Sequence, residues 1–215
     1  GCHFADGDEE SVRARGAVVF PRLPDNPTDS YRTRLYTPDE LFDTATYAAS
    51  LDARGYAYSR RPQTREVTLA AALHDLAVDE ALTDWMLGRD IVGVMGGHAW
   101  LRDSAQYADA VRLGRGIAQF ATVATGGGPG AMEAANLGAW LAAYPTAALD
   151  EALVRLARCP SFSPDIDAWV DAARDVRAAY PDGAESLGVP TWHYGHEPPN
   201  LFAASIAKYF RNAVR

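Results

Sequence analysis

The sequence predicts an α/β fold in which helices flank a parallel sheet. Two short apolar runs, at 91–95 and 120–124, each end in a glycine-rich turn, and a segment of helical composition follows each turn. Strand, turn and helix repeated in this order imply parallel strands joined by right-handed crossovers. We therefore expect the two runs to be adjacent parallel strands, with both glycine turns at the same edge of the sheet.

Composition and charge limit the classes of protein to consider. The 215 residues are 48% hydrophobic and 22% charged, as expected for a soluble globular chain of about one domain with an appendage. No apolar run approaches the roughly 18 residues that cross a bilayer, and a net charge of −8 argues against a general nucleic-acid binder. With only two cysteines, no disulfide framework is expected, which favours a cytoplasmic location.

Residues 1–90 are predicted to form a mainly helical N-terminal extension. The run 17–20 is a possible short strand. Thr37, Pro38 and Glu40 supply an N-cap hydroxyl, a proline at the first helical position and an acid three residues past the cap, so a helix should run from there to about Gly55. A second helix is expected from Thr68 to Leu87.

Residues 91–215 are predicted to form a Rossmann-like nucleotide-binding domain. Helices are expected at 104–119 and 131–143, followed by a helical insertion at about 146–181 with helices at 147–158 and 164–180. A third strand is expected within 186–194. The last element is predicted to be an amphipathic helix from Phe202 to Arg215, with apolar side chains on one face and basic ones on the other.

The most informative motif is the turn Gly126-Gly127-Gly128-Pro129-Gly130 between a β run and a helix. Glycine allows a sharp turn and lets a ligand approach main-chain N–H groups, and the N-terminus of the following helix attracts a phosphate. The simpler alternative is a tight connection that binds nothing. Gly96 and Gly97 form the corresponding turn after the first run. His98 follows as a ligand contact or as a loop residue that bonds its own backbone.

Other polar residues are weaker candidates. Glu133 either bonds a sugar hydroxyl or complements the helix dipole. Lys208 and Arg211 lie on the basic face of the expected last helix, which either binds substrate or is solvated surface. Glu197 and Asn200, in the segment Glu-Pro-Pro-Asn, precede that helix. The histidines at 74, 193 and 196 lack the spacing of a metal site, so no metal is predicted.

The glycine turn also fits a dinucleotide-binding pattern. Gly126, Gly128 and Ala131 match G-x-G-x-x-G/A. The pattern requires an acid at the end of a strand about 20 residues later, whereas the sequence around Asp150 has a helical composition. A dinucleotide-dependent oxidoreductase is therefore the weaker alternative.

Two segments resemble a known enzyme family. VGVMGGH and TGGGPGAMEAANLGA resemble the first half of the LONELY GUY (LOG) family of nucleotide 5′-monophosphate phosphoribohydrolases. The segments Gly-Pro-Gly-Ala-Met-Glu and Glu-Pro-Pro-Asn resemble the larger bacterial purine/pyrimidine nucleotide nucleosidases more than the smaller members of the family. The resemblance covers about 91–143 and 197–215.

This resemblance implies hydrolysis of the N-glycosidic bond of a nucleoside 5′-monophosphate to free base and ribose 5-phosphate, without a cofactor. It implies substrate contacts from the two glycine turns, Met132, Glu133, Glu197 and Asn200, and a catalytic role for Arg211 or Lys208. The family's second motif, P-G-G-x-G-T-x-x-E, which carries its catalytic glutamate, does not occur in the 215 residues. We expect the natural product to continue past Arg215 into that motif, and the protein to form a homo-oligomer.

The sequence therefore favours two functions over the oxidoreductase. The protein is a nucleotide nucleosidase, or it is a nucleotide-binding or sensing module that does not cleave its ligand. In both, the expected partner is a nucleoside monophosphate or a related phosphorylated small molecule, with no nucleic acid and no membrane.

Overall fold

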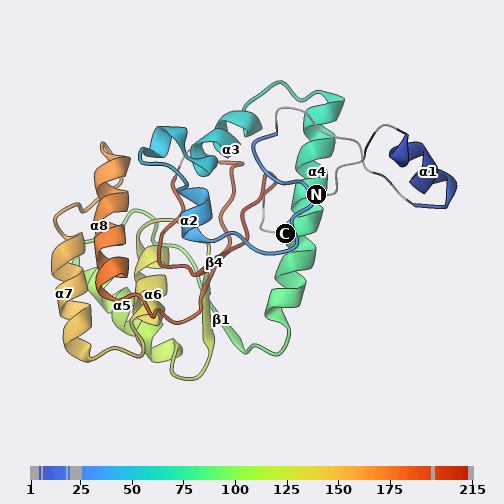
Figure 1. Ribbon diagram of the computed structural model, residues 1–215. Coiled ribbons are helices and arrows are strands. Elements are labelled where there is room, and N and C mark those ends of the chain that lie inside the picture. The colour runs from blue at the N-terminus through green and yellow to red at the C-terminus, as the bar shows by residue number, and fades with distance from the viewer. Residues whose placement is uncertain (1–4, 6, 18, 20–25, 195–196, 213–215) are drawn as a thin grey trace.

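A computed structural model describes residues 5, 7–17, 19, 26–194 and 197–212. Its centre is a parallel sheet in the order β1 (Ile91–Val94), β2 (Thr122–Thr125), β3 (Leu187–Gly188) and β4 (Ser205–Ile206) (Figure 1). The helical elements in these residues are α1 (Asp8–Ala14), α2 (Pro38–Leu41), η1 (Tyr47–Ala49), α3 (Leu51–Ser59), α4 (Arg65–Met86), α5 (Ala105–Ile117), α6 (Ala131–Trp140), α7 (Thr146–Leu156) and α8 (Ile166–Ala179).

The pairing of the first two strands confirms the predicted architecture. β1 and β2 are adjacent and parallel, with Ile91 opposite Thr122 and Val94 opposite Thr125. Their glycine turns consequently follow the same edge of the sheet. β3 extends the sheet on the far side of β2, within the run predicted as the third strand.

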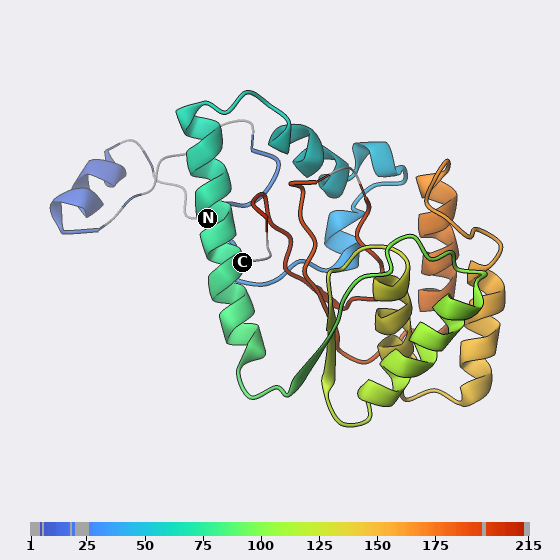
Figure 2. The ribbon, with the colours of Figure 1, turned by 180° about the vertical axis from the view of Figure 1, so that it is seen from behind.

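Helix α6 packs on β1 and β2, α5 packs on β2, and the two helices pack on each other (Figure 2). The two helices approach so closely that a Cβ added to Gly114 would strike the backbone carbonyl of Ala135. This contact fixes α6, and with it the glycine turn at its start, against the rest of the sheet. The predicted insertion is also present, as the helix pair α7 and α8, which lies across the molecule from α4 (Figure 1).

The predicted helix from Thr37 to about Gly55 is wrong in its extent. Thr37 caps α2 as expected, because its Oγ1 accepts the Glu40 N–H at 3.2 Å. The helix ends at Leu41, however, and α3 begins only after Ser50, whose side chain caps it by accepting the Ala53 N–H at 3.2 Å. The residues between are shaped by side chains that bond the backbone, such as Asp43, which accepts the Leu51 N–H at 2.7 Å. The other early prediction, a strand at 17–20, falls partly outside the described residues, at 18 and 20.

The predicted amphipathic helix from Phe202 to Arg215 is also wrong. Within the described part of this range, up to 212, the chain forms β4 and irregular segments. Its backbone bonds neighbouring segments: the Ile206 N–H donates to Tyr36 O and the Ala207 N–H to Gly188 O, both at 2.8 Å. Most side chains from Leu201 to Phe210 are buried, so the segment has no solvated face to match a helical stripe.

The N-terminal extension shares a core with the sheet domain. Tyr36 and Ile206 exchange two backbone hydrogen bonds, which places Tyr36 beside β4. One apolar cluster includes Leu41 and Val78 from the extension together with Phe202 and Tyr209. Among the described helices, none is long and apolar enough to cross a membrane.

Candidate functional site

The two glycine turns meet at the carboxyl edge of the sheet. The Ala131 N–H, at the start of α6, donates to Gly97 O at 3.0 Å. Gly130 has φ +72°, and a Cβ there would collide with the carbonyl oxygen of Gly97. Gly97 itself has φ +69°, and its own Cβ would lie 2.6 Å from that of Ala131. Both positions therefore require glycine, because only glycine permits this backbone geometry and this approach.

A pocket of about 420 Å³, here called the glycine pocket, opens beside these turns. It is lined by His98, Gly126, Gly128, Met132 and Glu197 from the predicted set, and by Val189, Pro190, Thr191, Tyr194 and Asn212. The site thus combines the turns after β1 and β2 with the segment after β3. This volume is within the roughly 300–1,000 Å³ usual for small-molecule sites.

Met132 and Glu197 form the pocket walls next to the glycines. A Cβ on Gly126 would lie 2.7 Å from Met132 Sδ, and one on Gly128 would lie 3.0 Å from Met132 Cε and 3.7 Å from Glu197 Oε2. Glu197 is the only acidic residue, and no lysine or arginine occurs, among the described residues that line the pocket. An anion held here would depend on backbone N–H groups rather than on a basic side chain.

Asn200 lies behind the glycine turn and is fully buried. Its backbone N–H donates to Gly127 O at 2.8 Å, and its Nδ2 donates to Gly128 O at 3.2 Å. Its Oδ1 accepts the N–H groups of Phe202 and Ala203. The side chain therefore supports the turn from beneath, and it is not among the residues that line the pocket.

Sequence reasoning missed the other members of this support. Asn136 Oδ1 accepts from Thr125 Oγ1 at 2.7 Å and from Asn200 Nδ2 at 3.1 Å, while Thr125 Oγ1 accepts the Gly127 N–H at 2.9 Å. Asn136 Nδ2 also donates to Ser186 Oγ. One signal was available: Asn136 is the only polar residue after Glu133 in an otherwise apolar, small-residue helix.

Glu133, predicted to touch a sugar, is paired inside the protein. Both it and Arg102 are shielded from solvent, and Arg102 binds the carboxylate through Nε at 3.0 Å and Nη2 at 2.5 Å. Burial alone would lower the pKa of Arg102, but the charge and hydrogen bonds of Glu133 outweigh it, so the pKa is raised. Burial and Glu133 together raise the pKa of Tyr107, which donates to the same carboxylate at 3.0 Å. Glu133 does not line the glycine pocket.

Lys208 and Arg211 both lie outside the glycine pocket lining. Lys208 is 1% exposed and pairs with Asp52 at 2.8 Å, with its Nζ 5.3 Å from the centre of a Trp192 ring. Arg211 pairs with Asp79 at 2.6 Å near the surface, which raises the pKa of its guanidinium. It lines a separate cavity of about 560 Å³ with Trp192 and Phe210. The residue after it, Asn212, is the one that reaches the glycine pocket.

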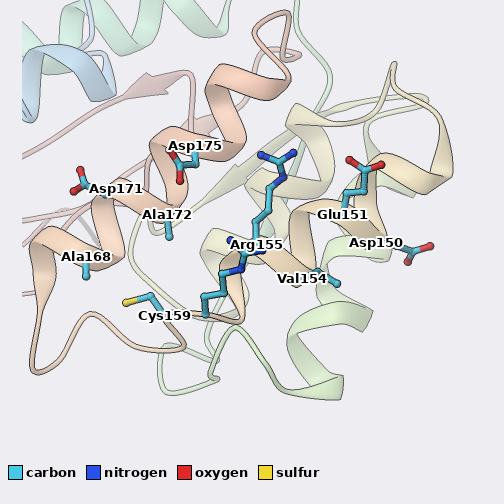
Figure 3. Close-up of a pocket in the computed structure, with 10 residues that line it drawn as sticks. Asp150, Glu151, Val154, Arg155, Cys159, Ala168, Asp171, Ala172 and Asp175 are labelled. Atoms are coloured by element: carbon cyan, nitrogen blue, oxygen red, sulfur yellow. The ribbon is translucent and has the colours of Figure 1, made fainter.

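A larger cavity, about 870 Å³, lies between α7 and α8 (Figure 3). Its lining mixes the arginines 155 and 158 with the acidic residues Asp150, Glu151, Asp171 and Asp175, and includes Cys159. It shares no lining residue with the glycine pocket. We place the candidate site at the glycine turns, because they bring a constrained backbone, a helix N-terminus and a carboxylate to one point.

Two further findings bear on the site. Within the part of the chain that the structure describes, no three His, Cys, Asp or Glu side chains gather to hold a metal ion; His196 lies outside that part. No protein-family model and no curated protein matched the chain in the comparisons.

Proposed function

We propose that the glycine pocket binds a nucleoside 5′-monophosphate and that the protein hydrolyses its N-glycosidic bond. The observation that carries the proposal is the junction of two glycine turns beside Glu197 in one pocket. The motifs on those turns are also the ones that resemble the nucleotide 5′-monophosphate phosphoribohydrolases.

The phosphate is assigned to the start of α6. The N–H groups of Gly127 and Ala131 already bond Thr125 Oγ1 and Gly97 O. We therefore assign the phosphate to the N–H group of Gly128, which lines the pocket near the positive end of the helix dipole. This mode of binding needs no basic side chain, in keeping with the pocket lining.

The ribose is assigned to Glu197, whose carboxylate oxygens accept hydrogen bonds from sugar hydroxyls. In the reaction a water oxygen bonds to C1′ and the bond from C1′ to the base nitrogen breaks. The electron pair leaves with the base, which takes up a proton. The transition state resembles an oxocarbenium ion, which a carboxylate stabilises. The resemblance assigns that carboxylate to the P-G-G-x-G-T-x-x-E motif, which does not occur in these 215 residues.

One structural detail weighs against the oxidoreductase alternative. Asp150 lies inside α7 rather than at the end of a strand, so it cannot take the ribose-binding position of the dinucleotide pattern. A second candidate function is better supported: nucleotide sensing without cleavage. It is favoured by the engagement of Lys208 and Arg211 with Asp52 and Asp79, away from the pocket.

Two measurements on the purified protein test the proposal. Calorimetry with AMP, GMP and a pyrimidine monophosphate should show binding, and adenosine or ribose 5-phosphate alone should bind more weakly. Glu197→Gln should weaken AMP binding roughly tenfold to a hundredfold, because a hydrogen bond to a charged group contributes about 1.5–3 kcal/mol. Glu80→Gln, an exposed change on α4, is the matched control and should bind as the wild type does.

Chromatographic detection of free base separates the two functions. The 215-residue chain should release base negligibly, and a product that carries the P-G-G-x-G-T-x-x-E motif should release it rapidly. Binding by both products without release by either would favour the sensor. No binding of any monophosphate would overturn both.

A further inference from the structure

Both side chains of the ion pair between Arg102 and Glu133 are fully buried. Removing two charges from water is costly, and buried ion pairs can often be replaced by apolar side chains of similar volume without loss of stability. Such a pair is therefore weak evidence for stabilisation. What distinguishes this pair is the set of segments that it joins.

Arg102 lies on the connection from the β1 glycine turn to α5, and it holds the helical insertion. Its Nη1 donates to Trp169 O in α8 at 3.0 Å and to Cys159 O after α7 at 3.4 Å. Its backbone N–H donates to Pro160 O at 3.1 Å. The guanidinium also lies 4.3 Å from the centre of a Trp169 ring.

Glu133 lies in the first turn of α6, two residues after Ala131, whose N–H is bonded to Gly97 O at 3.0 Å. The ion pair and this backbone bond thus tie the two glycine turns together at two points. Tyr107 in α5 adds a third hydrogen bond to the same carboxylate. The glycine pocket is therefore held by a closed set of contacts that runs through Arg102 into α7 and α8.

We propose that Arg102 is a positioning residue for nucleotide binding, which holds the two glycine turns in register and ties them to the α7–α8 insertion. The inference rests on the proposed function. Arg102 does not line the glycine pocket and acts through Glu133 and the start of α6. A loss of this link should widen the motion of the turns and reduce affinity for a phosphate at the start of α6.

A matched pair of isosteric variants tests the inference. Glu133→Gln and Asp52→Asn each neutralise the acid of a fully buried ion pair, the second with Lys208. The described side chains that bond the Asp52 carboxylate, Tyr47, Trp192 and Lys208, do not line the glycine pocket. Both variants should lose stability in urea. Glu133→Gln alone should also speed amide exchange at 96–98, 126–128 and 130, and it should weaken AMP binding at least tenfold.

Equal loss of AMP affinity in the two variants, or unchanged exchange at the glycine turns in Glu133→Gln, would overturn the inference. Should Glu133→Gln fail to fold, Tyr107→Phe removes one bond to Glu133 and should give a smaller change of the same kind; an unchanged exchange pattern there would count against the inference. The exchange measurement needs no ligand. It therefore decides the positioning role even if the wild-type protein binds no AMP, a result that would count against the proposed function instead.

Discussion

Asn136 and Asn200 join beneath the glycine turn, with Nδ2 of Asn200 donating to Oδ1 of Asn136 at 3.1 Å. The contact connects α6 to the segment before β4, and both side chains are fully buried. Every polar atom of the two amides is bonded within the protein. The turn that shapes the pocket is therefore supported by a satisfied network, and a satisfied buried network fixes one arrangement of the backbone.

Asn200→Leu should destabilise the fold by roughly 1–3 kcal/mol, because it leaves Gly128 O and the N–H groups of Phe202 and Ala203 without their buried partner. Asn136 Oδ1 also loses one of its two donors and keeps only Thr125 Oγ1. Urea unfolding measures the loss. AMP binding by the folded fraction should also weaken, since the turn loses its support. A variant with wild-type stability would show that Asn200 does not hold the turn.

Gly128→Ala should mainly weaken AMP binding, whereas Gly130→Ala should mainly reduce the stability of the fold. A Cβ at Gly128 meets the end of the flexible Met132 side chain and points toward Glu197, so the fold should persist while AMP binding falls about tenfold, or 1.4 kcal/mol. A Cβ at Gly130 meets the backbone of Gly97 at a positive φ, and should cost on the order of 1–3 kcal/mol of stability. Parallel unfolding and calorimetry on both variants check this. Equal stabilities would contradict it.

Lys208→Met and Arg211→Ala should differ strongly in stability. Lys208→Met leaves Asp52 buried without its cation, which typically costs about 3–5 kcal/mol. The pair of Arg211 with Asp79 is about two-fifths exposed on each side, so its loss should cost no more than about 1 kcal/mol. Thermal or urea unfolding distinguishes the two. If Arg211→Ala instead abolishes AMP binding at wild-type stability, the result would favour the role in the site that the resemblance implies for Arg211.

Stability should fall as the pH drops below about 6.5, where a histidine in the unfolded chain takes up a proton. His74 is buried, with Nε2 2.7 Å from the Tyr36 hydroxyl and Nδ1 3.0 Å from Asp75 Oδ1. Burial lowers the pKa of His74, and the hydrogen bond and charge of Asp75 oppose that shift only in part. The folded protein therefore binds its proton at lower pH than the unfolded chain, and it loses stability between those two values.

The measurement is urea unfolding of the wild type and His74→Gln across about pH 5–7. Glutamine can accept from Tyr36 and donate to Asp75, but it does not titrate. The variant should therefore lose less stability than the wild type over this range, because carboxylates contribute equally to both. Parallel stability curves would exclude His74 as the source.

Sequence reasoning predicted the fold where the local pattern and the tertiary structure agree. The runs at 91–95 and 120–124 became β1 and β2, and the glycines between strand and helix became the pocket edge. It failed at 202–212, the described part of the predicted last helix, because apolar residues at helical spacing are also compatible with a buried extended chain. The segment is a helix if the Ile206 backbone bonds its own segment and a strand if it bonds Tyr36. Residues distant in the sequence decide between the two conformations.

The candidate site divides in the same way. The glycine turns could be predicted from the sequence, because the backbone conformation that requires glycine is a local property. The environment of a charge is not local: Glu133 was read as a sugar contact because nothing in the sequence places Arg102 against it. Asn200 was predicted to contact the substrate, but it lies behind the glycine turn, where it bonds Gly128 O and Asn136, sixty-four residues away in the sequence.

The core that the N-terminal extension shares with the sheet domain affects how the chain folds during synthesis. Apolar surfaces of α3 and α4, with Tyr58 and Val78, are buried by a cluster that also contains Trp192 and Phe210, and Gly55 packs directly on the Trp192 ring. During synthesis from the N-terminus, both helices leave the ribosome well before those partners exist. Contacts between such distant residues also form slowly. The apolar faces of α3 and α4 therefore stay exposed in the growing chain until Trp192 and Phe210 have been synthesised and can cover them.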